Sequence, residues 1–462
     1  MDNLILDTDS YKASHFLQYP PGMTAMFSYI ESRGGRYGRT VFFGLQYILK
    51  KYMTQRVTLE MVNEADAFLR AHGEPFPREG WEYIARDLRG CLPLKIRAVP
   101  EGSVVPTHNV LATIESTDPR VYWVVGWLET QLMRVWYPIT VATQSYFIKQ
   151  EILAALEKSA DDPQSEIAFK LHDFGSRGVS SRESAEIGGM SHLVNFMGSD
   201  TIAGVWAANH YYHSAMAAFS IPAAEHSTIT AWGKKREVDA YRNMLNQFAK
   251  PGAVLACVSD SYDLENAVQN LWGSALRDQV IASGATLVVR PDSGDPPTIV
   301  RRTLERLDAA FGHTLNAKGY RVLNHVRVIQ GDGINQNSIR AILQNALDGG
   351  YSATNLTFGM GGALLQQLNR DTQKFAMKLS AVVINGRALP AYKDPVTDPA
   401  KKSKAGRLDL IQTADGYATI TLPDAEPDAR SALRAVFENG ELLLDETLDV
   451  VRARVNQAAR AR

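Results

Sequence analysis

The chain has 462 residues, 45% of them hydrophobic and 21% charged, and 49 Lys and Arg nearly balance 50 Asp and Glu. The length suggests two domains, or one large barrel with an appended layer. The composition is typical of a soluble globular protein, and nothing in the charge balance suggests an extended basic surface for nucleic acid. Cys91 and Cys257 are too few for a disulfide framework, and the start "MDNLILDTDSYKASH" lacks the apolar core of a signal peptide. No stretch approaches the roughly 18 apolar residues of a membrane helix. We therefore expect a cytoplasmic protein that binds neither nucleic acid nor membrane.

The two ends of the chain both contain predicted strands. Within residues 1–160, "AMFSYIESRG" predicts a strand, "TVFFGLQYILKKYM" and "TLEMVNEADAFLRAHG" predict helices, and 92–117 predicts a meander with Pro and Gly turns. Residues 386–462 hold further short strands, such as "GYATITL" and "GELLLDE". We expect 1–160 and 386–462 to build one accessory α+β sheet domain together.

Residues 161–385 repeat a different pattern, in which a β-rich run ends in Gly, Asp or His and an amphipathic helix follows. For example, "AVLACVSDSYD" precedes "LENAVQNLWGSAL", and "ATLVVRPDSGDP" precedes "TIVRRTLERLDAAF". Apolar strands that alternate with helices predict a parallel sheet covered by helices, hence an α/β fold. Six or seven such units with polar strand ends favour a β/α barrel over an open sheet, because the strand ends of a barrel converge on one face.

Two glycine clusters lie late in this predicted barrel, each between a strand and a helix. They are "GDGIN" at 331–335 and "FGMGG" at 358–362. Glycines there let backbone N–H groups approach an anion, and the following helix adds a favourable dipole. Tight turns alone would also explain glycines, but two adjacent loops of this kind indicate a phosphorylated ligand.

Charged residues follow two of the predicted strands. Arg290 and Asp292 lie in "VVRPDSGDP", where they either pair with each other or bind phosphate and ribose hydroxyls or a Mg²⁺ shell. Asp332 in "QGDG" is a second candidate for ribose hydroxyls. Arg370 and Lys378 directly follow the second glycine cluster, which favours contact with phosphate.

A single histidine stands in "SIPAAEHSTITAWG", with Glu225 beside it. No serine-nucleophile motif or metal-ligand spacing accompanies His226, so its active roles are a general base or a nucleophile that becomes phosphorylated. A buried histidine bound to a backbone carbonyl is the structural alternative. The neighbouring phosphate motifs favour phosphorylation.

An aromatic residue and an arginine occupy another strand end, in "LHDFGSRG". Phe174 is either part of the core or, with Arg177, a platform for a flat heteroaromatic ring. His210 and His213 are more simply explained by packing, and we expect no structural metal.

Taken in order, these motifs resemble those of the nicotinamide phosphoribosyltransferases. The chain is similar to a bacterial-type member of this group, which belongs to the type II phosphoribosyltransferase family. The resemblance runs from about residue 4 to 410 and rests on "LDTDSYKASHFLQYPPGMT", "HDFGSRGVSS", "NFMGSDT", "AAEHSTITAWG", "SDSYD", "RPDSGDP", "QGDGIN" and "FGMGGALLQ". It implies an irregular β/α barrel with an accessory sheet domain, working as a homodimer with shared active sites. The implied reaction converts nicotinamide and phosphoribosyl pyrophosphate into nicotinamide mononucleotide and pyrophosphate, with Mg²⁺ and with ATP that phosphorylates His226.

The resemblance also implies roles for individual residues. Phe174 would stack on the pyridine ring, Tyr11 of the partner subunit would cover its other face, and Arg177 and Asp200 would contact its amide. His226, Asp292 and Arg290 form the implied catalytic group. The implied ribose and phosphate contacts are Asp332, Gly331, Gly361, Gly362, Arg370, Lys378, Lys393, Lys401 and Arg33.

Three other functions compete with this interpretation. A nicotinate phosphoribosyltransferase is the nearest, but the Asp200 carboxylate suits an amide donor and repels the nicotinate carboxylate. A flavin-binding β/α-barrel oxidoreductase would need neither His226 nor the lysines, so we expect no flavin. A non-catalytic metabolite sensor is disfavoured because each candidate catalytic position holds a chemically competent residue.

Overall fold

The computed structural model describes residues 3–397, 402–414, 416–423 and 427–460. The chain forms two compact units, each made from separate stretches of sequence. Unit 1 comprises Met1–Thr143, His210–Ser214 and Leu368–Arg462, and unit 2 comprises Gln144–Asn209 and Ala215–Gln367. The units divide at 143/144 and 367/368, whereas the sequence placed boundaries at 160/161 and 385/386. The reason for the second difference is that strand β14 (Phe375–Ile384) pairs with β1 (Met23–Ser32) of unit 1.

Unit 2 contains a parallel six-stranded sheet, in agreement with the predicted β/α pattern. Its order is β7, β6, β13, β12, β9, β8, with the bounds Gly198–Ser199, Leu171–Asp173, Leu356–Met360, Val326–Gln330, Thr286–Arg290 and Val254–Val258. The segment 219–223 forms a β-bridge with each of the two edge strands. Phe219 pairs with Gly198 of β7, and Ala223 pairs with Ala256 of β8. Because all strands run the same way, their carboxyl ends meet at the same edge of the sheet.

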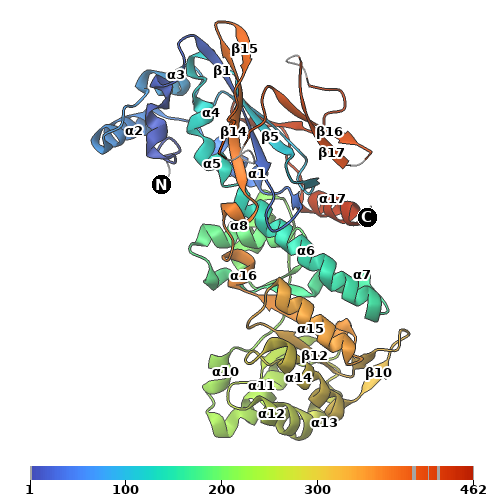
Figure 1. Cartoon of the computed structure of the whole chain (residues 1–462). Helices are drawn as coiled ribbons and strands as arrows, with labels where there is room; N and C mark the ends of the chain where they lie inside the picture. Colours follow the sequence, from blue (N-terminus) through green and yellow to red (C-terminus); the bar gives the residue numbers. More distant parts are fainter. Residues whose placement is uncertain (1–2, 398–401, 415, 424–426, 461–462) are drawn as a thin grey trace. The chain divides into compact units, whose positions relative to one another are not determined.

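Helices lie around these strands (Figure 1). The Asp295 side chain caps α14 by accepting from Thr298 N at 3.2 Å, and Asn335 caps α15 in a capping box with Ser338. These caps keep the strand-to-helix loops short and therefore fix the residues within them. The helices within unit 2 are α7 (Pro163–Glu166), α8 (Arg182–His192), α10 (His226–Thr230), α11 (Glu237–Phe248), α12 (Leu264–Asn266), α13 (Arg277–Ser283), α14 (Pro296–Phe311), α15 (Gln336–Asp348) and α16 (Gly362–Leu365). Helix α9 (Ile202–Tyr211) begins in unit 2, and its last two residues belong to unit 1. The hairpin β10–β11 (His313–Leu315, Arg321–Leu323) lies between α14 and β12 in the chain.

Unit 1 contains an antiparallel seven-stranded sheet that draws on both ends of the chain. Its order is β15, β14, β1, β5, β3, β18, β19, with the bounds Arg387–Pro390, Phe375–Ile384, Met23–Ser32, Val110–Ser116, Leu94–Ala98, Arg434–Glu438 and Glu441–Leu442. Two further pairs are β2 with β4 (Arg39–Val41, Val104–Pro106) and β16 with β17 (Leu408–Thr413, Gly416–Thr421). The N-terminal strands β1, β5 and β3 thus lie in the middle, and the C-terminal strands lie at both edges.

The helices of unit 1 agree with the sequence pattern in part. The predicted helix at 58–73 is α2 (Leu59–His72), capped by the Thr58 side chain. The predicted helix at 40–53 begins later, with α1 (Leu45–Ile48), because Arg39–Val41 is strand β2. The other helices are α3 (Arg78–Arg86), α4 (Val124–Trp127), α5 (Glu129–Met133) and α17 (Leu448–Arg460), and α6 (Trp136–Ser159) contains the 143/144 boundary.

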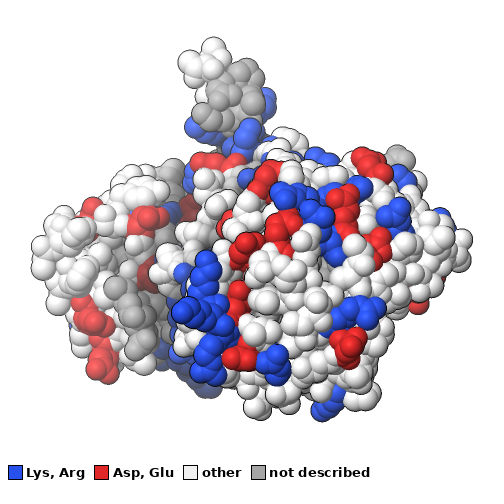
Figure 2. All heavy atoms as spheres, turned by 90° about the horizontal axis from the view of Figure 1, so that it is seen from below, with Lys and Arg blue, Asp and Glu red and all other residues white. Residues whose placement is uncertain are grey.

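The helices and the surface charge of the molecule bear on the expectation that it binds neither membrane nor nucleic acid. In the part of the chain that the structure describes, no helix combines the length and apolar character needed to cross a bilayer. On the face drawn in Figure 2, Lys and Arg side chains are interspersed with Asp and Glu.

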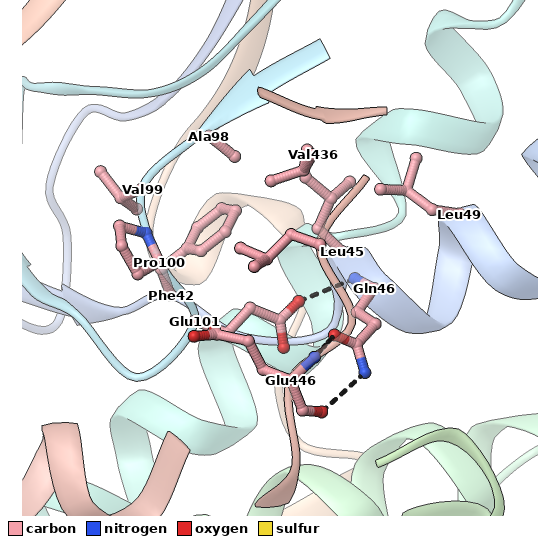
Figure 3. Close-up of a pocket in the computed structure, with 11 residues that line it drawn as sticks. Phe42, Leu45, Gln46, Leu49, Ala98, Val99, Pro100, Glu101, Val436 and Glu446 are labelled. Carbon is pink, nitrogen blue, oxygen red and sulfur yellow. Dashed lines mark hydrogen bonds between the residues drawn. The ribbon is translucent and has the colours of Figure 1, made fainter. Parts of the chain in front are cut away.

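A buried carboxyl group ties three distant segments of unit 1 together. Glu101 accepts hydrogen bonds from Gln46 N at 2.7 Å and from the Tyr212 hydroxyl at 2.6 Å. Gln46 in turn exchanges hydrogen bonds with the backbone of Glu446 (Figure 3). Gln46, Glu101 and Glu446 help to line a cavity of about 20 Å³, room for a single water. Burial raises the pKa of Glu101 to about 7, against the lowering effect of the Gln46 N–H and the Tyr212 hydroxyl.

The raised pKa of Glu101 predicts a pH-dependent stability. Because the folded state holds this proton where the unfolded chain has released it, the free energy of unfolding falls as the pH rises from 4.5 to about 7. We expect Glu101→Gln to remove about 3 kcal/mol of this pH dependence, measured by urea unfolding at pH 4.5 and pH 7.5. Exposed Glu441→Gln is the control, and an unchanged pH dependence in Glu101→Gln would contradict the assignment.

Candidate functional site

The carboxyl ends of the unit 2 strands surround an open pocket of about 590 Å³. It collects predicted residues that are far apart in the sequence. The lining residues are Phe174, Ser176, Arg177, Asp200, Thr201, Ala223, Ala224, Glu225, Arg290, Asp292, Gly331, Asp332 and Gly361.

An aromatic ring forms part of the pocket lining. Phe174 directly follows β6, and its backbone N–H donates to Met360 O at 3.0 Å. The ring packs against the apolar strand residues and lies 5.6 Å from the guanidinium carbon of Arg290. A side chain at Gly359 would overlap the Phe174 ring. Gly359 thus makes room for the aromatic platform, a role that sequence reasoning missed when it assigned the whole "FGMGG" cluster to phosphate.

An arginine and an aspartate form a bidentate pair at the end of β9. Arg290 Nε and Nη2 each lie 2.9 Å from an oxygen of Asp292, so the internal pairing that the sequence left open is present. Asp292 has a φ of 49°, a left-handed conformation that costs energy for a residue other than glycine. Gly331 packs against this pair, since a Cβ there would lie 3.1 Å from both Arg290 Nη2 and Asp292 Oδ1.

The single histidine lies at the start of α10 with its side chain 49% exposed, rather than buried. His226 Nδ1 is 3.2 Å from the Ser261 hydroxyl oxygen. His226 Nε2 faces two carboxylates, at 3.5 Å from Asp292 Oδ2 and 3.7 Å from Asp260 Oδ1. The two ring nitrogens therefore have different surroundings, one with a hydroxyl and one with negative charge.

Asp260 is a site residue for which the sequence analysis assigned no role. Its side chain is 5% exposed, and Oδ1 is buried without a hydrogen-bond partner in the described structure. Burial raises the pKa of Asp260, and Asp292 raises it further, while Ser293 and His226 lower it. Asp260 could have been predicted from its place in "SDSYD", which begins directly after the apolar strand β8.

Two polar groups flank the pocket near Phe174. The Ser220 hydroxyl donates to Asp200 Oδ1 at 2.5 Å, so one carboxylate oxygen is occupied and fixed. Arg177 lies 3.8 Å from Glu225 Oε2, and the two side chains are 84% and 59% exposed. Such an exposed ion pair contributes little, so Arg177 can exchange Glu225 for a ligand.

The glycines at the end of β13 leave backbone accessible. Gly361 lines the pocket, and a Cβ at Gly362 would meet nothing within 4 Å. Asp332 lies in the loop that follows β12. Its backbone carbonyl accepts a hydrogen bond from the Gln330 side chain at 3.0 Å. An anion can therefore approach the 361–362 backbone without a steric barrier.

The remaining predicted residues belong to unit 1, except that Lys401 lies outside the described residues. Lys378 is half-buried, which lowers its pKa, and Arg33, Arg370 and Lys393 lower it further by their positive charge, whereas Glu129 raises it. These four cations therefore form a basic cluster within unit 1. Tyr11 lies in the 3₁₀ segment Ser10–Leu17 with 58% of its surface exposed.

No protein-only metal centre stands out in the described ranges. Among these residues, no group of three or more His, Cys, Asp or Glu side chains is placed to hold a metal ion.

Comparisons with known proteins identify the family of the chain. Residues 169–441 match the nicotinate phosphoribosyltransferase (NAPRTase) family, and residues 3–96 match the nicotinamide phosphoribosyltransferase N-terminal domain. A nicotinamide phosphoribosyltransferase from Xanthomonas campestris pv. campestris is 58% identical over 99% of each chain. One from Acinetobacter baylyi is 31% identical over 97% of this chain and 96% of its own.

Solved structures with low sequence identity share the fold. A nicotinate-nucleotide pyrophosphorylase from Pyrococcus furiosus matches with a TM-score of 0.63 at 15% identity, covering 99% of this chain and 96% of its own. Human nicotinic acid phosphoribosyltransferase matches with a TM-score of 0.63 at 17% identity, covering 98% and 93%. The common fold is a mixed α/β fold with a parallel half-barrel sheet. With these matches, the chain belongs to the nicotinate phosphoribosyltransferase family and, within it, to the nicotinamide phosphoribosyltransferases.

Proposed function

We propose that the chain transfers the phosphoribosyl group of phosphoribosyl pyrophosphate to nicotinamide, giving nicotinamide mononucleotide and pyrophosphate in NAD salvage. The relatives at 58% and 31% identity are named for this activity. The observation that carries the choice of base is Asp200 in the same pocket as Phe174.

The base specificity follows from the chemistry of these two side chains. Phe174 offers a flat apolar face for the pyridine ring. Asp200 Oδ1 is taken by Ser220, which leaves Oδ2 to accept from the amide N–H₂ of nicotinamide. A nicotinate carboxylate would meet a like charge there, which costs several kcal/mol when desolvated. Arg177, 3.8 Å from Glu225, would turn to the amide oxygen.

The transfer step needs charge stabilisation at the ribose and at the leaving group. The bond from C1 to the pyrophosphate oxygen breaks as the pyridine nitrogen bonds to C1, through an oxocarbenium-like state. We assign Arg290 to the phosphates and Asp292 and Asp332 to the ribose hydroxyls. The backbone at 361–362 and the basic cluster Arg33, Arg370, Lys378 and Lys393, together with Lys401, are the proposed further phosphate contacts.

Carboxylates in the site suit a Mg²⁺ ion bound together with substrate. Mg²⁺ commonly takes one or two protein carboxylates and completes its shell with phosphate oxygens. Asp260 and Asp292 fit this requirement, because Asp260 Oδ1 is buried without a hydrogen-bond donor and both carboxylates face His226. When bound, the ion would neutralise charge that develops on the departing pyrophosphate.

We further propose that ATP phosphorylates His226. Asp292, whose Oδ2 lies 3.5 Å from Nε2, would hold the proton on that nitrogen, which leaves the Nδ1 lone pair beside Ser261 as the nucleophile. The new Nδ1–phosphorus bond replaces the bond to the ADP oxygen, and the phosphohistidine then lies near the pyrophosphate position, coupling ATP hydrolysis to the transfer.

The proposal includes a homodimer with shared sites. Apolar side chains are exposed on α9 and the segment after it, with Ile202 74%, Met216 50% and Phe219 49% exposed. Exposed apolar surface of this kind marks interaction sites, and most homo-oligomers are two-fold dimers. Tyr11, exposed in its own subunit, would then cover the nicotinamide ring of the partner's site.

The finer description of the fold belongs to the same proposal. An irregular β/α barrel is supported by the segment that bridges both edge strands through Phe219 and Ala223. An accessory α+β domain from both termini is supported by the order of the seven-stranded sheet.

Exchanging the proposed specificity carboxylate tests the choice of base. In Asp200→Ser we expect kcat/KM for nicotinamide to fall about thirtyfold, through loss of a charged hydrogen bond worth about 2 kcal/mol, while that for nicotinate rises. Steady-state assays with both bases measure the ratio. Asp278→Ser, whose native side chain is 97% exposed, is the matched control. An unchanged ratio in Asp200→Ser would refute the assignment.

Labelling with γ-labelled ATP tests the phosphohistidine. Wild type should take up acid-labile, base-stable label, and His226→Ala should take up none while keeping transfer that ATP no longer stimulates. The exposed His72→Ala is the control. Label retained in His226→Ala would place the phosphate elsewhere.

A further inference from the structure

A buried acid lies behind the base-binding part of the pocket, outside its lining. Asp173 is the last residue of β6 and is fully buried, and Phe174 follows it directly. The proposed function gives Asp173 no role, and it does not line the pocket.

Asp173 makes hydrogen bonds to both sides of the base subsite. Its backbone oxygen accepts from Asp200 N at 2.9 Å. Its side-chain Oδ1 accepts from Gly175 N at 2.7 Å and so holds the turn that carries Phe174. One residue thus fixes the aromatic platform and the specificity carboxylate.

We propose that Asp173 is a positioning residue of the nicotinamide subsite, which sets Phe174 and Asp200 relative to each other without touching the base. This inference rests on the proposed function, since that function assigns Phe174 and Asp200 to nicotinamide.

The surroundings of Asp173 favour the neutral form of its carboxyl group more than water does. Burial raises its pKa to about 7, while the Gly175 N–H lowers it and the Asp200 carboxylate raises it. Thr201 faces the carboxyl, but Oδ2 and Thr201 Oγ1 fall short of hydrogen-bond geometry and have no partner among the described residues.

Close packing leaves this carboxyl little freedom. A Cβ at Gly189 of α8 would lie 3.3 Å from Asp173 Oδ2 and 2.9 Å from the Gly204 Cα of α9. The two helices therefore approach closely behind Asp173 and confine Oδ2. A side chain without an acceptor at 173 would release the Gly175 N–H and with it the turn.

Two variants separate positioning from general packing. Asp173→Asn keeps a neutral acceptor for Gly175 N–H, so we expect the KM for nicotinamide to stay within about threefold of wild type. Asp173→Ala removes the acceptor, and we expect that KM to rise about tenfold or more while the KM for phosphoribosyl pyrophosphate stays within about twofold. Asp449→Ala, with a native side chain that is 86% exposed, is the control.

Three outcomes would overturn the inference. They are an unchanged nicotinamide KM in Asp173→Ala, an equal rise for both substrates, or an Asn variant as impaired as the Ala variant. Wild type that fails to use nicotinamide would instead overturn the proposed function. A wild type that works, with an unaffected Ala variant, overturns only the role of Asp173.

A second measurement applies if Asp173→Ala does not fold. The folded protein keeps the Asp173 proton between pH 3.8 and about 7, where the unfolded chain has lost it, so wild-type stability falls as the pH rises through this range. Urea unfolding of Asp173→Asn should show a weaker pH dependence. Identical pH dependence in wild type and Asp173→Asn would mean that Asp173 is ionised in place and would overturn its assignment as a neutral acceptor.

Discussion

Parallel hydrogen bonding between the strands of unit 2 is the constraint on which the pocket depends. It brings the ends of β6, β9, β12 and β13 to one edge, so that residues separated by more than a hundred positions share one surface. Each strand contributes chemistry of a different kind there: an aromatic ring, an arginine–aspartate pair, a ribose-binding candidate and accessible backbone. The capped helices then hold these short loops in place.

The charged groups around the pocket are paired with one another. Arg290 binds Asp292 with both arms of its guanidinium group, Arg177 lies near Glu225, and His226 faces Asp260 and Asp292. A phosphate that binds Arg290 must compete with Asp292 for the same guanidinium group. Under the proposed assignment, the carboxylate displaced from this pair would become available to a ribose hydroxyl or a metal ion.

The sequence predicted site residues whose own side chains are aromatic, charged or nucleophilic. It missed residues that act through their packing and hydrogen bonds. Phe174 and Arg290 lie at strand ends and His226 begins a helix, in segments that the alternation of predicted strands and helices identifies. Gly359 and Asp173 lie in the same motifs, but their roles depend on a ring across the sheet and on a backbone N–H from another loop, which no local pattern encodes. The pairing of β14 with β1 joins positions about 350 residues apart, and for the same reason the boundary near residue 368 could not be read from composition.

The strand order of the unit 1 sheet has a consequence for how the protein is made. Its central strands β1, β3 and β5 leave the ribosome early, whereas the strands on both flanks lie beyond residue 374. During synthesis the growing polypeptide therefore carries two open sheet edges while all the parallel strands of unit 2 are completed. Open edges of this kind attract other chains, and long-range strand pairing is slow. The nascent chain thus has an interval of exposure to aggregation that closes only when its last quarter has emerged.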